Sequence, residues 1–423
     1  MSVASRLRSR MSGVWWDPEF SKLWAGQTIS MVGSEVSILA LPLTAVLVLR
    51  ATPVQMGLLG AASTVPFLLF GLMAGVWIDR RRRRPVLIWS DLGRALLLAS
   101  VPAAMAIGLR RIEVLYVVAF ATGLLTLVFD VAYQAFLPAL VPAARLVNGN
   151  GRLETSRASA QVLGPGLAGP LIQTVGAPMA ILVDAVSYLA SVAFLLGIRS
   201  NERRPDRSEF GSPVRQMIEG TGALVGNPVL RAIVIASAFF NVTTSVSIAV
   251  YLLYVSRELG LSPGVIGAIY AIGSVGTLAG AVLAAQLTRR LGVNRALVLA
   301  ALVASAGMLL RPLAVPPEWL TVVLLASGQA LFGFAVPNWN INQTSLRQEL
   351  TPARLQGRVH ASFRFLARGA MPVGMLVGGV LGSAIGLRPT LLLAAVGALL
   401  AVVTVLLSPL RMARPGAATG RGT

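Results

Sequence analysis

The stretch GLMAGVWIDRRRRRPVLIW, residues 71–89, places Asp79 and five consecutive arginines, Arg80 to Arg84, between two apolar segments. The rest of the chain has the same character: 55% of its 423 residues are hydrophobic and 12% are charged. Its mean hydropathy is +0.75. Soluble domains carry about 25% charged residues. The composition therefore predicts a polytopic membrane protein whose basic cluster lies in a short loop between two spans.

Several functional classes are excluded by composition. The net charge of +20 is spread over short clusters between apolar segments, so nucleic acid is not an expected partner. The chain has no cysteine, and His360 is its only histidine, which argues against a metal site. Lys22 is the only lysine, so the chain has no phosphate-binding loop of the G-x-x-x-x-G-K-[ST] type. We expect no cofactor, no metal and no enzymatic activity.

The number of apolar segments sets the predicted fold class. A span needs roughly 20 residues to cross about 30 Å of hydrocarbon. We expect an all-α membrane protein with twelve transmembrane helices at about 24–48, 54–78, 86–108, 114–138, 159–175, 178–198, 230–254, 264–287, 295–314, 320–341, 361–384 and 388–409.

The distribution of positive charge predicts the orientation. Alternate loops, together with both termini, hold 29 of the 36 lysines and arginines. By the positive-inside rule these loops and both termini are cytoplasmic, in the cell membrane. A hydrophilic segment in the middle predicts two six-helix bundles: 1–198 with a cytoplasmic leader, a linker at 199–228, 229–410, and a cytoplasmic tail at 411–423. The end of the linker, 214–226, is expected to form a short interfacial helix.

An internal repeat supports this division. The segments LVPAARL (140–146) and LTPARL (350–355) are nearly the same sequence. At an offset of 210, residues of the first half match those of the second in the pairs Pro53/Pro263, Gly57/Gly267, Arg80/Arg290, Leu140/Leu350, Pro142/Pro352 and Gly176/Gly386. Duplicated six-helix bundles with parallel topology are typical of transporters that bind substrate between the halves.

The loop that opens this section resembles a family signature. GVWIDRRRRRP is similar to the G-x-x-x-D-R-x-G-R-R motif of the major facilitator superfamily, with Arg82 in place of the second glycine. The resemblance implies a gating loop that joins the two halves on the cytoplasmic side in the outward-open state. Its matched residues are Gly75, Asp79, Arg80, Arg83 and Arg84.

Longer segments narrow the resemblance to one branch. Residues 129–171, 181–191 and 345–379 resemble enterobactin-type siderophore exporters and macrolide-efflux proteins. Gly164-Pro165 and Gly169-Pro170 are similar to the helix 5 hinge of drug:proton antiporters, although their spacing differs. The fourth span lacks the arginine that many such antiporters carry. The resemblance implies export of an amphipathic small molecule, a drug, antibiotic or siderophore, in exchange for protons.

The strongest candidate site residue is Glu35 in the first span. It lies about 19 Å from the cytoplasmic end at 1.5 Å per residue, near the middle of the membrane. A carboxylate there is costly and marks a functional site by default. Glu35 is expected to bind protons or substrate. The alternative is a glutamate hydrogen-bonded to neighbouring helices for packing alone.

Other intramembrane charges have structural alternatives. Asp91 and Arg94 are three residues apart, which favours an ion pair that braces the basic loop or takes part in gating. Asp130 and its repeat partner Asn340 are expected to form inner-gate contacts or simple hydrogen bonds between helices. Asp184 is interpreted as structural.

The second half offers polar and aromatic side chains for a substrate pocket. Asn241, Asn338, Trp339 and Asn340 could present hydrogen bonds and an aromatic face to a large amphipathic ligand. We expect a monomer in the lipid bilayer whose partners are a small-molecule substrate and protons. The alternatives are an importer or uniporter of the same fold, or a non-transporting receptor or assembly partner.

Overall fold

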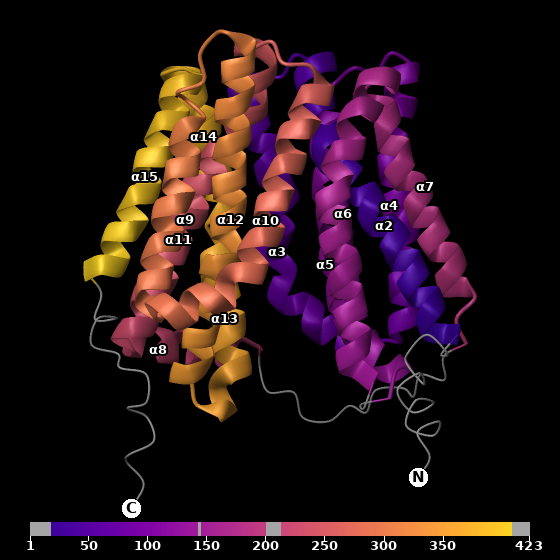
Figure 1. Cartoon of the computed structure of the whole chain (residues 1–423). Coiled ribbons are helices and arrows are strands. Elements are labelled where there is room, and N and C mark those ends of the chain that lie inside the picture. The colour runs from indigo at the N-terminus through magenta and orange to yellow at the C-terminus, as the bar shows by residue number, and fades with distance from the viewer. Residues whose placement is uncertain (1–17, 143–144, 200–212, 408–423) are drawn as a thin grey trace, which may run out of the picture. The chain divides into compact units, whose positions relative to one another are not determined.

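The computed structural model describes residues 18–142, 145–199 and 213–407, and the regular structure of this part is helical throughout (Figure 1). The leader, residues 200–212 of the linker expected at 199–228, and the tail at 411–423 lie outside the described residues. The helices of the first half are α2 (Pro18–Leu43), a π-helical turn (Thr44–Val48), α3 (Pro53–Asp79), α4 (Arg83–Ala106), α5 (Ile112–Leu140), α6 (Leu146–Val175) and α7 (Ala177–Leu196).

The second half repeats this order after a short helix. Its elements are α8 (Pro213–Gly226), α9 (Pro228–Leu253), a π-helical turn (Tyr254–Glu258), α10 (Pro263–Leu291), α11 (Val293–Leu310), α12 (Glu318–Leu350), a 3-10 turn (Ala353–Leu355), α13 (Gln356–Gly369), α14 (Met371–Ala384) and α15 (Leu387–Leu407). The starts of α9, α10, α11, α13 and α15 lie 210 residues after those of α2, α3, α4, α6 and α7. The sequence repeat is therefore also a repeat of helix boundaries.

The repeat extends to backbone conformation. Arg50 follows the first π-helical turn with φ +52°, and Gly260 follows the second with φ +65°. This left-handed region is unfavourable for residues with a Cβ and accessible to glycine. The same turn is thus built twice, once with a glycine and once with a strained arginine.

Eleven helical segments of the described residues are long and apolar enough to cross a membrane. Large apolar side chains on these helices are exposed, such as Met73 (68%) and Trp89 (69%), as expected of lipid-facing surfaces. The segment expected at 159–175 is the apolar end of α6, which falls short of a candidate span because its first half, LVNGNGRLETSRASA, is polar. The chain is a multi-pass membrane protein.

Contacts divide the chain into two units. Unit 1 comprises Met1–Ala51, Ala62–Phe210 and Leu261–Ala271, and unit 2 comprises Thr52–Ala61, Gly211–Gly260 and Ile272–Thr423. In unit 1, α2 packs on α6 and α7, and α4 packs on α5 and α7. In unit 2, α9 packs on α14 and α15, and α11 packs on α12 and α15. The bundle boundaries expected at 1–198 and 229–410 stay a prediction.

One close backbone crossing made by glycines recurs in the two units. In unit 2, a Cβ added at Gly57 of α3 would lie 2.6 Å from the Met375 carbonyl oxygen and 3.0 Å from Gly379 Cα. In unit 1, a Cβ added at Gly267 of α10 would lie 2.6 Å from the Pro165 carbonyl oxygen and from Gly169 Cα. Each residue of one crossing lies 210 positions from a residue of the other, so sterics explain why these glycines repeat.

The span expected at 361–384 is built from two helices, α13 and α14, that meet at Ala370. Pro372 cannot donate a hydrogen bond to the carbonyl four residues before it, which favours a break at this point. Asn241 Nδ2 of α9 donates to the Ala367 carbonyl at 2.8 Å and so satisfies a helix-end acceptor beside the break.

The short helix α8 occupies the segment expected to be helical at 214–226, and it packs against α13 (Figure 1). Glu219 of α8 forms an ion pair with Arg358 of α13. Ser362 Oγ donates to the Met217 carbonyl at 3.2 Å. One face of α13 is therefore held by α8.

Candidate functional site

Glu35 lies near the middle of the span Pro18–Val48 and is half-buried. Its side chain packs against Gly164 of α6, which has no side chain of its own. A Cβ added at Gly164 would overlap the Glu35 Cβ and would lie 2.9 Å from the Glu35 Cγ. Among the described residues, no hydrogen bond or ion pair to the Glu35 carboxylate is found. This carboxylate can therefore gain or lose a proton without breaking a contact to another side chain.

Asp91 and Arg94 of α4 are both buried and form an ion pair in unit 1. The Arg94 guanidinium carbon lies 4.3 Å from the ring centre of Phe129 in α5 and 4.2 Å from that of Tyr188 in α7. Such cation–π contacts are strong where water is excluded. Arg94 thus links three helices of unit 1.

A second buried acid continues this network into α2. Asp184 of α7 is 1% exposed, and its Oδ1 accepts hydrogen bonds from Ser34 Oγ (3.3 Å) and Ser187 Oγ (3.1 Å). Ser34 Oγ is also 2.9 Å from the Tyr188 hydroxyl, which accepts from Arg94 Nη1 at 3.4 Å. Asp91, Arg94, Tyr188, Ser34 and Asp184 form one continuous polar network, and its two acids are held by fixed donors.

Asp130 of α5 and Asn340 of α12 are exposed at repeat-related positions. Asp130 lies close enough to Arg94 to interact with it electrostatically. Of the acids predicted from the sequence, Glu35 is half-buried and Asp130 is exposed. Asp91, in contrast, is buried and paired with Arg94.

The arginine-rich loop makes its main described contacts with the end of α7. Arg84 Nε donates to the Leu195 carbonyl (2.9 Å) and Arg84 Nη2 to the Leu196 carbonyl (2.7 Å). Lys22 Nζ donates to the next carbonyl, that of Gly197, at 2.7 Å. Cations at the carboxyl end of a helix offset its unpaired carbonyls and its dipole. Arg84 therefore caps α7.

The remaining motif residues lie in different surroundings. Arg80 is exposed and Arg83 is half-buried. A Cβ added at Gly75 would meet no atom within 4 Å, so packing does not require glycine there. The surroundings of the Asp79 side chain lie outside the described part of the structure. A gating role for this loop stays a prediction.

Helix α6 runs through Gly164, Pro165, Gly169 and Pro170 without a break. Gly164 accommodates Glu35, and Gly169 forms the crossing in unit 1. Close packing thus accounts for both glycines in this structure, and hinge motion in α6 stays a prediction.

The predicted pocket residues of the second half lie in different surroundings. Asn338 Nδ2 donates to the Gly280 carbonyl of α10 at 3.1 Å. Trp339 is buried and stacks on Phe240 with ring centres 6.1 Å apart. Asn241 caps the carbonyl beside the α13–α14 break, whereas Asn340 is exposed. The amides of Asn241 and Asn338 serve helix packing here, and substrate contact by any of the four stays a prediction.

Two buried arginines were missed by sequence reasoning. Arg311, 4% exposed, donates to Ser247 Oγ at 2.8 Å and to Gln329 Oε1 at 3.1 Å. Arg347, 3% exposed, lies in α12 beside α13. Both come near the ends of apolar segments, where an arginine is normally assigned to a loop. The sequence carries no local signal that separates a buried arginine at a helix end from an arginine in a loop.

Comparison with known proteins now identifies the family. The model of the Major Facilitator Superfamily matches residues 23–373. The chain belongs to this superfamily. It is 30% identical over 407 residues to the multidrug efflux pump Tap of Mycolicibacterium fortuitum, which covers 93% of the chain and 95% of the relative.

A second relative and a solved structure extend the comparison. Macrolide efflux protein A of Streptococcus pyogenes is 24% identical, over 89% of the chain and 93% of that protein. A bacterial homologue of the iron transporter ferroportin, in an inward-facing state, has a TM-score of 0.74 at 18% identity, with 92% of this chain and 97% of that chain covered. At this identity the structural likeness shows the fold alone. The family model and the efflux relatives show that the protein described here is a transporter of small molecules and not an enzyme.

Proposed function

We propose that the protein exports an amphipathic small molecule, a drug, antibiotic or siderophore-like compound, from the cell in exchange for protons. The observation that carries the proposal is Glu35, a half-buried carboxylate in mid-span with no described partner. The names of the relatives, a multidrug efflux pump and a macrolide efflux protein, favour export over import.

In this proposal Glu35 holds the coupling proton. Its carboxylate is neutral when protonated, which suits an apolar surrounding, and it is charged after releasing the proton. Alternating access by the two halves would expose it first to one side of the membrane and then to the other. Asp130, exposed on α5, is a second candidate for protons or substrate. The network around Arg94 keeps α2, α4, α5 and α7 in register while this happens.

The proposed orientation places both termini and the arginine-rich loop in the cytoplasm, and the protein is proposed to act as a monomer. The absence of native cysteine makes the orientation easy to test. A cysteine introduced at Arg82 should react with an impermeant maleimide in inverted vesicles but not in intact cells. One introduced at Arg110 should show the opposite pattern, and equal labelling of both from one side would refute this orientation.

The coupling test uses inverted vesicles, energised with a proton gradient and offered lipophilic drugs and a siderophore. Wild type should accumulate at least one compound, a protonophore should abolish this, and Glu35→Gln should fail to accumulate it. Glu154→Gln is the matched control, because Glu154 is an exposed glutamate whose nearest described cation, Arg157, lies 3.9 Å away.

The remaining outcomes separate the alternatives. Accumulation by Glu35→Gln at the wild-type level would reject Glu35 as the coupling residue. Movement that is insensitive to the protonophore would favour a uniporter. No movement of any compound would favour a non-transporting receptor or assembly partner.

A further inference from the structure

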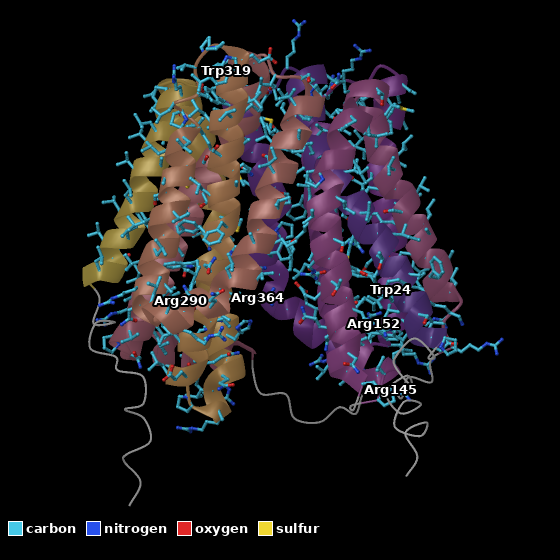
Figure 2. All side chains as sticks on the ribbon, viewed as in Figure 1. Trp24, Arg145, Arg152, Arg290, Trp319 and Arg364 are labelled. Carbon is cyan, nitrogen blue, oxygen red and sulfur yellow. The ribbon has the colours of Figure 1, made fainter. Side chains whose placement is uncertain are left out.

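Unit 2 contains a cluster of basic side chains, three arginines and one histidine, that the proposed function does not use. His360, Arg364 and Arg368 follow one another at intervals of four residues along α13, and so they lie on one face of the helix. Arg347 of α12 joins them: its Nη2 lies 3.0 Å from His360 Nδ1. Arg364 projects from the side of α13 in Figure 2. We refer to Arg347, His360, Arg364 and Arg368 as the α13 basic cluster.

Arg347 is buried without an acidic partner among the described residues. Its Nη1 donates to Gln343 Oε1 at 2.8 Å, and its guanidinium carbon lies 4.1 Å from the ring centre of Phe363. In the described part of the chain no carboxylate comes within ion-pair distance of Arg347, His360 or Arg364. A buried charge without a counter-charge is costly, and neighbouring charges of the same sign add to the cost.

Two other arginines of the described chain have the acidic partner that Arg347, His360 and Arg364 lack. Arg94, equally buried, forms an ion pair with Asp91. Arg358, on the face of α13 that packs against α8, forms one with Glu219. Among the described residues, Arg347 therefore differs from the equally buried Arg94 in lacking a counter-charge, and Arg364 differs from Arg358 of the same helix in the same way.

The donors of the cluster suit an oxyanion. Because an arginine can only donate, His360 Nδ1 must accept from Arg347, and His360 Nε2 then carries the proton and is a donor. Arg364 is exposed, and its guanidinium can bind a carboxylate or phosphate through two parallel hydrogen bonds. An anion bound here would supply the counter-charge that Arg347 lacks.

We propose that the α13 basic cluster binds the carboxylate or phosphate of the transported compound, so that organic anions with an apolar body are the substrate class. The inference rests on the proposed function for the statement that the bound compound is transported. An anionic lipid headgroup carries the same chemistry, and the test separates the two sources.

The test measures binding to the purified full-length protein in an uncharged detergent. The probe is 11-(dansylamino)undecanoic acid, compared with its methyl ester, which lacks the charge. Wild type should bind the acid about tenfold or more tightly than the ester, the effect expected for a charge-assisted hydrogen bond. Arg347→Gln and Arg364→Gln should remove this preference.

Arg358→Gln is the matched control and should keep the preference, because Arg358 lies on the same helix but is paired with Glu219. If Arg347→Gln does not fold, Arg364→Gln decides alone, since that side chain is exposed. Equal affinity of wild type for acid and ester, or a preference that persists in Arg364→Gln, would overturn the proposal.

Two further arms identify the source of the anion. Displacement of the acid by phosphatidylglycerol, and not by phosphatidylcholine, would assign the cluster to a lipid headgroup and overturn the substrate assignment. In inverted vesicles the acid should accumulate with wild type and not with Arg364→Gln. If wild-type vesicles accumulate uncharged drugs but not the acid, this inference is refuted and the proposed export function is retained.

Discussion

Replacing Arg84 with alanine tests whether the arginine-rich loop stabilises the first half by capping α7. Arg84 donates to two successive carbonyls at the end of this helix, those of Leu195 and Leu196. Alanine removes both donors and leaves Lys22, which donates to the Gly197 carbonyl, as the remaining cap. The helix would keep its sequence and lose one of the two described cationic side chains that donate to its carboxyl end.

The expected loss follows from the exposure of these bonds. A hydrogen bond from a charged donor contributes about 1.5–3 kcal/mol when buried. The bond to Leu195 is partly buried and the bond to Leu196 is exposed, so we assign about 1 kcal/mol to each. Arg84→Ala should therefore lower the free energy of unfolding by about 2 kcal/mol, which changes the ratio of folded to unfolded protein by roughly 30-fold.

The assay is reversible unfolding in mixed micelles of increasing sodium dodecyl sulfate content, followed by tryptophan fluorescence. Arg82→Ala is the matched control, because Arg82 is an exposed arginine of the same loop, and it should change the free energy by less than about 0.5 kcal/mol. Arg84→Lys, which keeps one charged donor, should recover about half of the loss. Equal stability of Arg84→Ala and Arg82→Ala would refute the capping role.

Three further predictions concern packing and backbone conformation, and they use the same unfolding assay. Gly267→Ala should cost about 1–3 kcal/mol because its Cβ would overlap backbone atoms, whereas Gly151→Ala, in open space on α6, should stabilise by up to about 1 kcal/mol; equal effects would reject the crossing. Asn241→Ala should cost about 1–3 kcal/mol and speed hydrogen exchange beside the α13–α14 break, and unchanged exchange would argue against its capping role. Arg50→Gly should stabilise by about 1 kcal/mol and Gly260→Ala should destabilise by a similar amount, and the opposite signs would refute strain at these turns.

Hydrophobic length and the 210-residue repeat were enough to predict most of the fold. The length of the apolar segments is informative because a span in lipid must satisfy its own backbone hydrogen bonds, and the helix does so within one segment. The break at Ala370 was missed because Pro372 lies within an apolar segment long enough for one helix. Apolarity reports that a segment crosses the membrane and says little about whether its helix is continuous.

The candidate site was predictable where a charge interrupts an apolar segment. Glu35 and the pair Asp91/Arg94 were found in this way. The contact between Arg347 and His360 in the second half was not predicted. Both residues lie near predicted helix ends, where charged side chains are common. The burial of Arg347 depends on how α12 packs against α13, a contact between segments that local sequence does not encode.

Packing and charge follow different rules across the internal repeat. The crossing glycines recur at the offset of 210 because backbone atoms touch there and no larger residue fits. The buried charges do not recur: the positions 210 residues from Glu35, Asp91, Arg94, Asp184, Arg311 and Arg347 hold Ser245, Ala301, Ala304, Ala394, Val101 and Leu137. Sterics therefore constrain both halves alike, whereas each buried charge belongs to one half only. On the proposals made above, the acids of the first half handle the proton and the cations of the second half bind the anionic substrate. Because the two sets do not overlap, Glu35→Gln should abolish proton coupling while leaving the acid–ester preference intact, and Arg364→Gln should do the reverse.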